Sequence, residues 1–154
     1  MRALARFLAT FGPVGYAPVA PATAGSAVVA AIGWFLPVPP LARTLALIAA
    51  GTALAVWIAG EAEKDLGHDA KPIVVDEAVG QSLALLLVPH ALLAFAASFV
   101  LFRIFDVWKP LGAREIQRLP GGLGVVADDV IAGLTACGAF HAGAWAGRAM
   151  GWWG

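Results

Sequence analysis

The sequence predicts an all-α integral membrane protein, a polytopic bundle of about four to five helices preceded by an N-terminal amphipathic segment at the membrane interface. Of its 154 residues, 60% are hydrophobic and only 13% are charged. Four long segments carry no charged side chain: residues 7–42, 44–60, 78–102 and 130–147. Each of the last three is close to the roughly 20 residues that a helix needs to cross a bilayer. The length suits one compact domain, so we expect residues 1–154 to form a single membrane-embedded domain.

Proline, glycine and apolar spacing divide the chain into helices. Near the N-terminus, Leu4, Phe7, Leu8 and Phe11 follow helical spacing, which is typical of a short helix lying in the membrane interface. Thr23 has the side chain of an N-cap for the first helix of the bundle. The helices expected after the interfacial segment cover residues 24–36, 41–63, 76–88, 91–108 and, beyond the glycines at 121–124, a last stretch to about 148.

The basic residues predict how these helices are oriented. With the N-terminus in the cytoplasm, most lysines and arginines fall on the inner side of the membrane, and only Arg43 and Arg148 fall on the outer side. The same orientation places every carboxylate at the cytoplasmic face. These acids are Glu61, Glu63, Asp65, Asp69, Asp76, Glu77, Asp106, Glu115, Asp128 and Asp129. We therefore expect several helices to offer acids at one membrane face.

Acids at the edge of lipid-embedded helices usually line a polar site or bind a metal, because desolvating them is unfavourable. Two adjacent pairs stand out, Asp76 with Glu77 and Asp128 with Asp129, and we expect the two pairs to approach each other. Mg²⁺ takes oxygen ligands, so three or four carboxylates from different helices, with Asp69 nearby, would suit it, and one more could position a water. The alternative for either pair is compensation of a helix dipole.

Basic side chains beside the acids indicate an anionic ligand. Lys71, Arg103 and Lys109 could neutralise phosphate oxygens, a major contribution in phosphoryl chemistry. The glycines at 121–124 precede a helix N-terminus, where free backbone N–H groups attract anions, although a plain turn is the simpler role. Asp106 lies three residues from both Arg103 and Lys109, so a structural ion pair on one helix face is the alternative there.

The sequence contains little support for other kinds of chemistry. The net charge is zero and no basic run with interleaved aromatics occurs, so we expect no nucleic-acid partner. No HExxH, paired-cysteine or GxSxG pattern indicates zinc or a serine nucleophile. Three classes remain: a lipid phosphomonoesterase, a small membrane cation transporter or channel that uses the clustered carboxylates, and a non-catalytic lipid-binding protein. The gathering of acids at one face, rather than along a conduction path, favours the enzyme.

Four blocks of sequence carry a family resemblance. In order, they are residues 18–26 (PVAPATAGS), 69–80 (DAKPIVVDEAVG), 102–110 (FRIFDVWKP) and 121–133 (GGLGVVADDVIAG). Together they resemble the phosphatidylglycerophosphatase A family of bacterial inner-membrane lipid phosphatases, although Ala22 stands where the family usually has glycine. The resemblance implies Mg²⁺-dependent hydrolysis of phosphatidylglycerophosphate to phosphatidylglycerol and phosphate, in phospholipid biosynthesis, at an active site facing the cytoplasm.

The residues and the resemblance together give three groups of expected site residues. The catalytic group is Asp76, Glu77, Asp106, Asp128 and Asp129. The substrate-binding group is Thr23, Ser26, Lys71, Arg103, Lys109 and Gly122. The Mg²⁺ ligands are Asp69, Asp76, Glu77, Asp128 and Asp129. The expected partners are the phospholipid substrate and the membrane lipid, and the sequence gives no indication of oligomeric state.

Overall fold

The computed structural model describes residues 2–109 and 113–151 of the chain, and within these ranges all regular secondary structure is helical. The all-α prediction is therefore confirmed for the described residues. The elements in chain order are α1 (Arg2–Ala9), the 3-10 turn η1 (Val14–Tyr16), α2 (Pro21–Phe35), α3 (Leu41–Leu66), α4 (Val75–Ala84), α5 (Leu92–Trp108), α6 (Ala113–Ile116) and α7 (Gly122–Ala149).

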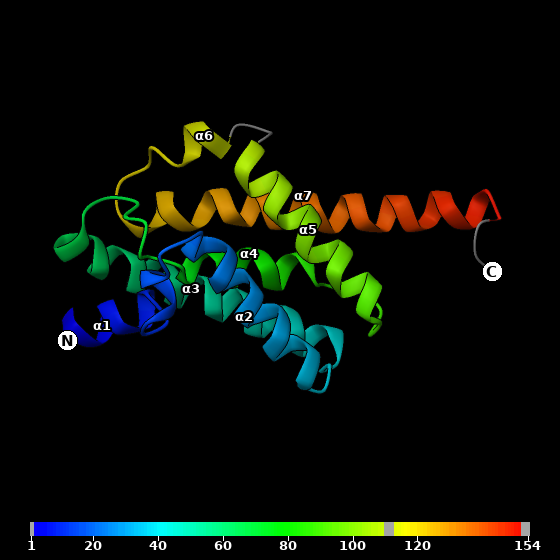
Figure 1. The fold of residues 1–154 in the computed structure, drawn as a ribbon, viewed down its shortest axis with the longest axis horizontal. Coiled ribbons are helices and arrows are strands. Elements are labelled where there is room, and N and C mark those ends of the chain that lie inside the picture. The colour runs from blue at the N-terminus through cyan, green and yellow to red at the C-terminus, as the bar shows by residue number, and fades with distance from the viewer. Residues whose placement is uncertain (1, 110–112, 152–154) are drawn as a thin grey trace.

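Helix α4 is the centre of the bundle. It packs against α7, α3 and α2, while α5 crosses α7 and touches the far end of α4 (Figure 1). Eight of the ten residues of α4 are buried, including the acids Asp76 and Glu77 in its first turn. The short central helix thus carries its carboxylates into the core instead of presenting them to the outside.

Glycines let α4 and α7 approach closely. A Cβ on Gly133 of α7 would lie 2.3 Å from the carbonyl oxygen of Gly80, and a Cβ on Gly80 would lie 2.4 Å from the ring of Phe102. Only residues without a side chain fit such a crossing. Because Asp129 lies one turn before Gly133, this contact brings that acid beside the first turn of α4.

The N-terminal helix α1 lies along α3. Ala5 and Ala9 are buried, whereas Leu4 and Phe7 are exposed, and the N–H of Val74 donates a hydrogen bond to the carbonyl of Ala9 over 2.8 Å. The small face of α1 therefore packs on the protein and its large apolar side chains point outward. This confirms a short amphipathic helix, and its placement in a membrane interface stays a prediction.

Three predicted helix boundaries were wrong. Helix α2 begins at Pro21, with Ala20 at the N-cap in a left-handed conformation (φ 49°), and no side chain caps it. Proline is favoured at the first helical position because its φ is preset and it needs no N–H partner. Since the helix begins at Pro21, Thr23 lies inside the helix and is not its cap. Helix α4 ends at Ala84, four residues early, before a turn in which Leu87 has a φ of 60°. Helix α7 begins at Gly122 instead of after the glycines.

Two of the described helices, α3 and α7, have the length and apolar composition to cross a membrane. Helix α2, with 15 residues, is apolar but shorter. The helical bundle is thus established for the described chain, and two membrane-crossing helices are compatible with it.

Candidate active site and metal centre

A pocket of about 480 Å³ opens where the first turn of α4, the N-terminal part of α7 and the C-terminal end of α5 meet. Its polar lining is six carboxylates and two lysines, with one glutamine. The carboxylates are those of Asp69, Asp76, Glu77, Asp106, Asp128 and Asp129, and the lysines are Lys71 and Lys109. Every acid that the sequence singles out as catalytic or metal-binding therefore lines one pocket.

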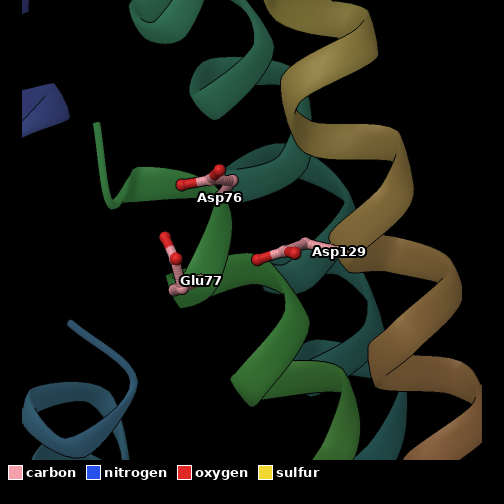
Figure 2. A group of neighbouring side chains, drawn as sticks. All are labelled: Asp76, Glu77 and Asp129. Atoms are coloured by element: carbon pink, nitrogen blue, oxygen red, sulfur yellow. The ribbon is translucent and has the colours of Figure 1, made fainter. Parts of the chain in front are cut away.

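Three of these acids form a tight cluster, which we call the carboxylate cluster: Asp76, Glu77 and Asp129. One carboxylate oxygen from each lies within 4.8 Å of the others. Figure 2 shows Asp129 reaching from α7 toward the two acids in the first turn of α4. Their exposed fractions are only 7%, 6% and 3%. The expectation that acids of the two pairs approach each other is confirmed.

Asp128 and Asp69 line the pocket outside this cluster. Asp128 is also buried, at 4% exposed, whereas Asp69 is exposed and accepts a hydrogen bond from the side-chain amide of Gln117. The five expected metal ligands therefore divide into a cluster of three and two neighbours, one of which is engaged by a glutamine.

The carboxylates of the cluster and of neighbouring Asp128 lack part of their hydrogen-bond partners. Asp76, Glu77, Asp128 and Asp129 each have one buried carboxylate oxygen without a hydrogen-bond partner among the described residues. Buried carboxylates in contact are stable only when protons or a cation neutralise part of their charge. All the ligand atoms are hard carboxylate oxygens, with neither histidine nor cysteine in the cluster. The donor set fits a hard divalent cation such as Mg²⁺.

Lys109 links two of the helices that form the pocket. Its ammonium pairs with the carboxylate of Asp128 on α7, and not with Asp106, which its spacing on α5 had indicated. The reason is local: Lys109 is the C-cap of α5 and takes a left-handed conformation (φ 51°), so its side chain leaves the helix face that Asp106 occupies. A partly buried cation thus lies directly beside the carboxylates.

Arg103 lies close to the carboxylates of Asp106 and Glu77. Its Nη1 lies 3.0 Å from Asp106 Oδ2, so the ion pair that helical spacing offered as an alternative is present, and 4.0 Å from Glu77 Oε1. The same nitrogen donates a hydrogen bond to Ser26 Oγ over 3.3 Å, and Ser26 Oγ in turn donates to the carbonyl of Ala22. Arg103 and Ser26 do not line this pocket, and their expected role in substrate binding stays a prediction.

The remaining residues expected to bind substrate take different positions. Lys71 lines the pocket and is exposed. Thr23 lies outside it, in an apolar groove against α5. Gly122 faces α3: a Cβ there would lie 2.0 Å from the carbonyl oxygen of Val56 and 2.6 Å from the N of Gly60. This close helix contact requires glycine at position 122, and a role of Gly122 in phosphate binding stays a prediction.

Several polar residues near the pocket were missed from the sequence. Gln117, which bonds Asp69, lies outside the four motif blocks, and no local pattern marks it. Glu63 Oε1 accepts the N–H of Asp69 over 3.0 Å and contacts His68 Nδ1, so the end of α3 holds the loop before α4. The backbone carbonyl of Gln117 and the carboxylate of Glu63 raise the pKa of His68. Gln81, one turn after Glu77, is fully buried with both amide atoms unpartnered among the described residues.

Backbone strain also gathers at the pocket. Of the five described non-glycine residues with positive φ, three line it: Ala20, Asp69 and Lys109, at 49°, 49° and 51°. Such conformations are unfavourable for residues with a Cβ and persist where the surroundings fix them. Here they place one acid and one lysine at the mouth of the pocket, which no spacing rule in the sequence predicts.

A helical protein with buried carboxylates and a lysine around one pocket has the polar groups of a metal-assisted hydrolase of phosphate esters. Comparison with known families agrees. The family model for phosphatidylglycerophosphatase A matches residues 7–144, and the chain belongs to this family. It is a phosphatase, a phosphoric monoester hydrolase.

Individual relatives give the same class. A protein of Bacteroides thetaiotaomicron, provisionally named phosphatidylinositol-3-phosphatase, is 43% identical over 129 residues, which covers 78% of this chain and 80% of the relative. The phosphatidylglycerophosphatase A of Escherichia coli is 32% identical over 130 residues, covering 82% and 76% of the two chains. That of Haemophilus influenzae is 36% identical over 86 residues, covering 54% and 53%. No solved structure gives a significant match.

Proposed function

We propose that this protein is a Mg²⁺-dependent phosphatidylglycerophosphatase, which hydrolyses phosphatidylglycerophosphate to phosphatidylglycerol and inorganic phosphate in phospholipid biosynthesis. The observation that carries the proposal is the buried carboxylate cluster, which lines one pocket together with the ion pair of Lys109 and Asp128. Membership of the phosphatidylglycerophosphatase A family and the names of the Escherichia coli and Haemophilus influenzae relatives support the choice of substrate.

The carboxylate cluster is the proposed Mg²⁺ site, with Asp76, Glu77 and Asp129 as ligands. When bound there, Mg²⁺ would supply charge neutralisation at the phosphate oxygens and make water a better nucleophile. The cluster supports this role because its oxygens are hard donors and the buried acids need a positive charge, and because one oxygen of each acid has no hydrogen-bond partner among the described residues.

The chain's own residues then provide the remaining groups. Lys109 places its ammonium at the pocket, where it would bind the phosphate oxygens on which negative charge develops. Asp128 accepts a hydrogen bond from Lys109 on one oxygen, while its buried Oδ1 has no partner among the described residues. We assign Oδ1 the task of accepting a hydrogen bond, and then a proton, from the attacking water. Arg103 fixes Asp106 and Glu77 through its ion pairs.

The proposed location is the bacterial inner membrane, with several helices crossing it and the pocket facing the cytoplasm. Large apolar side chains on the outer surface support insertion: Leu47 and Leu54 on α3 and Trp145 on α7 are 59%, 54% and 72% exposed. The excess of lysine and arginine on the acidic side supports the orientation. A pocket at this level would meet the head group of a lipid in the inner leaflet.

The head group has one specific alternative. The relative with 43% identity is provisionally named for phosphatidylinositol 3-phosphate, which is also a phosphomonoester lipid. Phosphate release from purified protein, assayed on both lipids with and without Mg²⁺, separates the two. We expect faster Mg²⁺-dependent release from phosphatidylglycerophosphate. Preferential release from the inositol lipid would overturn the substrate, and release from neither lipid would overturn the activity.

A cation transporter or channel is the other reading of clustered acids. The convergence of the carboxylates on one pocket favours a binding site over an ion-conduction path. In sealed vesicles, a transporter would move Mg²⁺ without any lipid substrate, and that result would contradict the proposal.

A further inference from the structure

We propose that the groove between α2 and α5 holds an acyl chain of the lipid whose phosphate enters the acidic pocket. The inference rests on the proposed function, since it names how the substrate of that same site is bound. The groove, called the α2–α5 groove below, is lined by residues of these two helices, which run antiparallel and slant the same way across Figure 1.

The groove adjoins the acidic pocket, and consecutive hollows along it share a lining residue. Val107 lines both the acidic pocket and a hollow of about 700 Å³ between α2 and α5. Phe99 lines that hollow and also a second one, of about 310 Å³, which reaches Trp34 and Leu92 near the other ends of the two helices. One apolar surface therefore connects the carboxylates to the opposite end of α5.

The length of the groove suits a lipid tail. From Val107 to Leu92, α5 advances about 22 Å at 1.5 Å per residue. One leaflet of the hydrocarbon core is about 15 Å deep. A chain that starts at the pocket can thus lie along the groove through the whole depth of its leaflet, even where α5 is tilted.

The groove changes from polar to apolar along its length, as a phospholipid does from its head group to its acyl chains. Its polar side chains, Thr23 and Arg103, lie in the hollow that adjoins the acidic pocket. Farther along, the second hollow is lined only by apolar and aromatic residues. Phosphate in the pocket, glycerol and ester groups near Thr23 and Arg103, and hydrocarbon beyond them would match this order. The groove wall is also open, since Ile104 is 50% exposed.

The test compares substrates that differ only in acyl length. Ala96→Trp fills the second hollow, about 16 Å along α5 from Val107, where a six-carbon chain from the pocket does not reach. Leu134→Trp on α7, where Leu134 is 52% exposed and lines none of these hollows, is the control. Activities are measured in mixed micelles on dioleoyl and dihexanoyl phosphatidylglycerophosphate. We expect Ala96→Trp to lower kcat/KM on the dioleoyl lipid about tenfold, equivalent to losing burial of about two methylenes. Its activity on the dihexanoyl lipid, and both activities of Leu134→Trp, should stay near wild type.

The possible outcomes distinguish a failure of the proposed function from a failure of the groove proposal. Absence of phosphate release by the wild type on both lipids would sink the proposed function. If the wild type is active, three results would overturn the groove proposal alone: an equal loss on both lipids in Ala96→Trp, no loss in Ala96→Trp, or the same loss in Leu134→Trp. A change of oligomeric state confined to Ala96→Trp, seen by light scattering in detergent, would assign the groove to a second copy of the chain instead.

A second measurement does not depend on any variant folding. A phosphatidylglycerophosphate analogue with a photoreactive diazirine midway along one acyl chain is cross-linked to the wild-type protein, and labelled peptides are identified. We expect labels on α2 and α5 that an excess of unlabelled substrate suppresses. Labels spread evenly over α3 and α7, unaffected by competition, would contradict the proposal.

Discussion

Replacing Asp129 with asparagine should stabilise the metal-free protein and remove most of the stabilisation that Mg²⁺ gives. In the carboxylate cluster, oxygens of Asp76, Glu77 and Asp129 lie within 4.8 Å of one another. At that separation, two full charges repel by about 3.5 kcal/mol for an effective dielectric constant near 20. Proton uptake relieves part of this repulsion in the wild type. We therefore expect Asp129→Asn to stabilise the metal-free protein by at least about 1 kcal/mol, a rise in Tm of about 2–4 °C.

Added Mg²⁺ should stabilise the wild type much more than the variant. A ligand at 100 times its Kd stabilises the folded state by about 2.7 kcal/mol, which raises the Tm of a protein of this size by about 5–10 °C. The wild type should show this rise, and Asp129→Asn should lose most of it, because one of the three ligand oxygens becomes a neutral amide.

Thermal unfolding of the detergent-solubilised protein, followed by tryptophan fluorescence over a Mg²⁺ titration, measures both effects. Asp65→Asn, which changes an exposed acid at the end of α3 that does not line the pocket, is the matched control and should behave as the wild type. A full Mg²⁺-dependent rise in Asp129→Asn, or a metal-free form less stable than the wild type, would refute the reasoning.

Three further predictions follow from individual contacts. Lys109→Met should lower kcat/KM about 10²–10³-fold and destabilise the fold by leaving Asp128 unpaired, and adding Asp128→Asn should restore the Tm; a loss of Tm in Lys109→Met without a loss of kcat/KM would make Lys109 structural. Gly80→Ala should lower the Tm by the equivalent of about 1–3 kcal/mol, because its Cβ meets Phe102 and a backbone oxygen of α7, whereas Gly138→Ala, with open space around it, should be nearly neutral; equal Tm values would contradict the packing. In a Cys137→Ala background, an impermeant thiol reagent should label Lys71→Cys only from the cytoplasmic side and Arg43→Cys only from the other; the opposite pattern would reverse the orientation.

The sequence predicted the composition of the site better than its geometry. Asp76 and Asp129 could be brought together from the sequence, because both lie at the starts of apolar helices and charge bias puts those starts at one membrane face. The pairing of Arg103 with Asp106 followed from helical spacing and is present. These features depend on local periodicity, which a sequence carries directly.

Features that depend on the ends of helices or on contacts between them were not predictable in the same way. Lys109 was expected to face Asp106, but its left-handed backbone turns it toward Asp128 on another helix. Gly122 was expected to bind phosphate, yet its lack of a side chain serves the contact with α3. Gln117 meets Asp69 across 48 positions of the chain. No spacing rule specifies such pairings, because tertiary packing fixes them.

We propose that Asp76, Glu77 and Asp129 hold the metal that the phosphatase uses. Manganese can replace magnesium at sites of carboxylate oxygens and gives an anomalous X-ray signal, so crystals of the protein soaked in Mn²⁺ test the claim most directly. We expect an anomalous peak among the three carboxylates, weakened when Mg²⁺ is added in excess. A peak elsewhere in the pocket, for instance at Asp69, with the three carboxylates bonded only to protein or water, would contradict it.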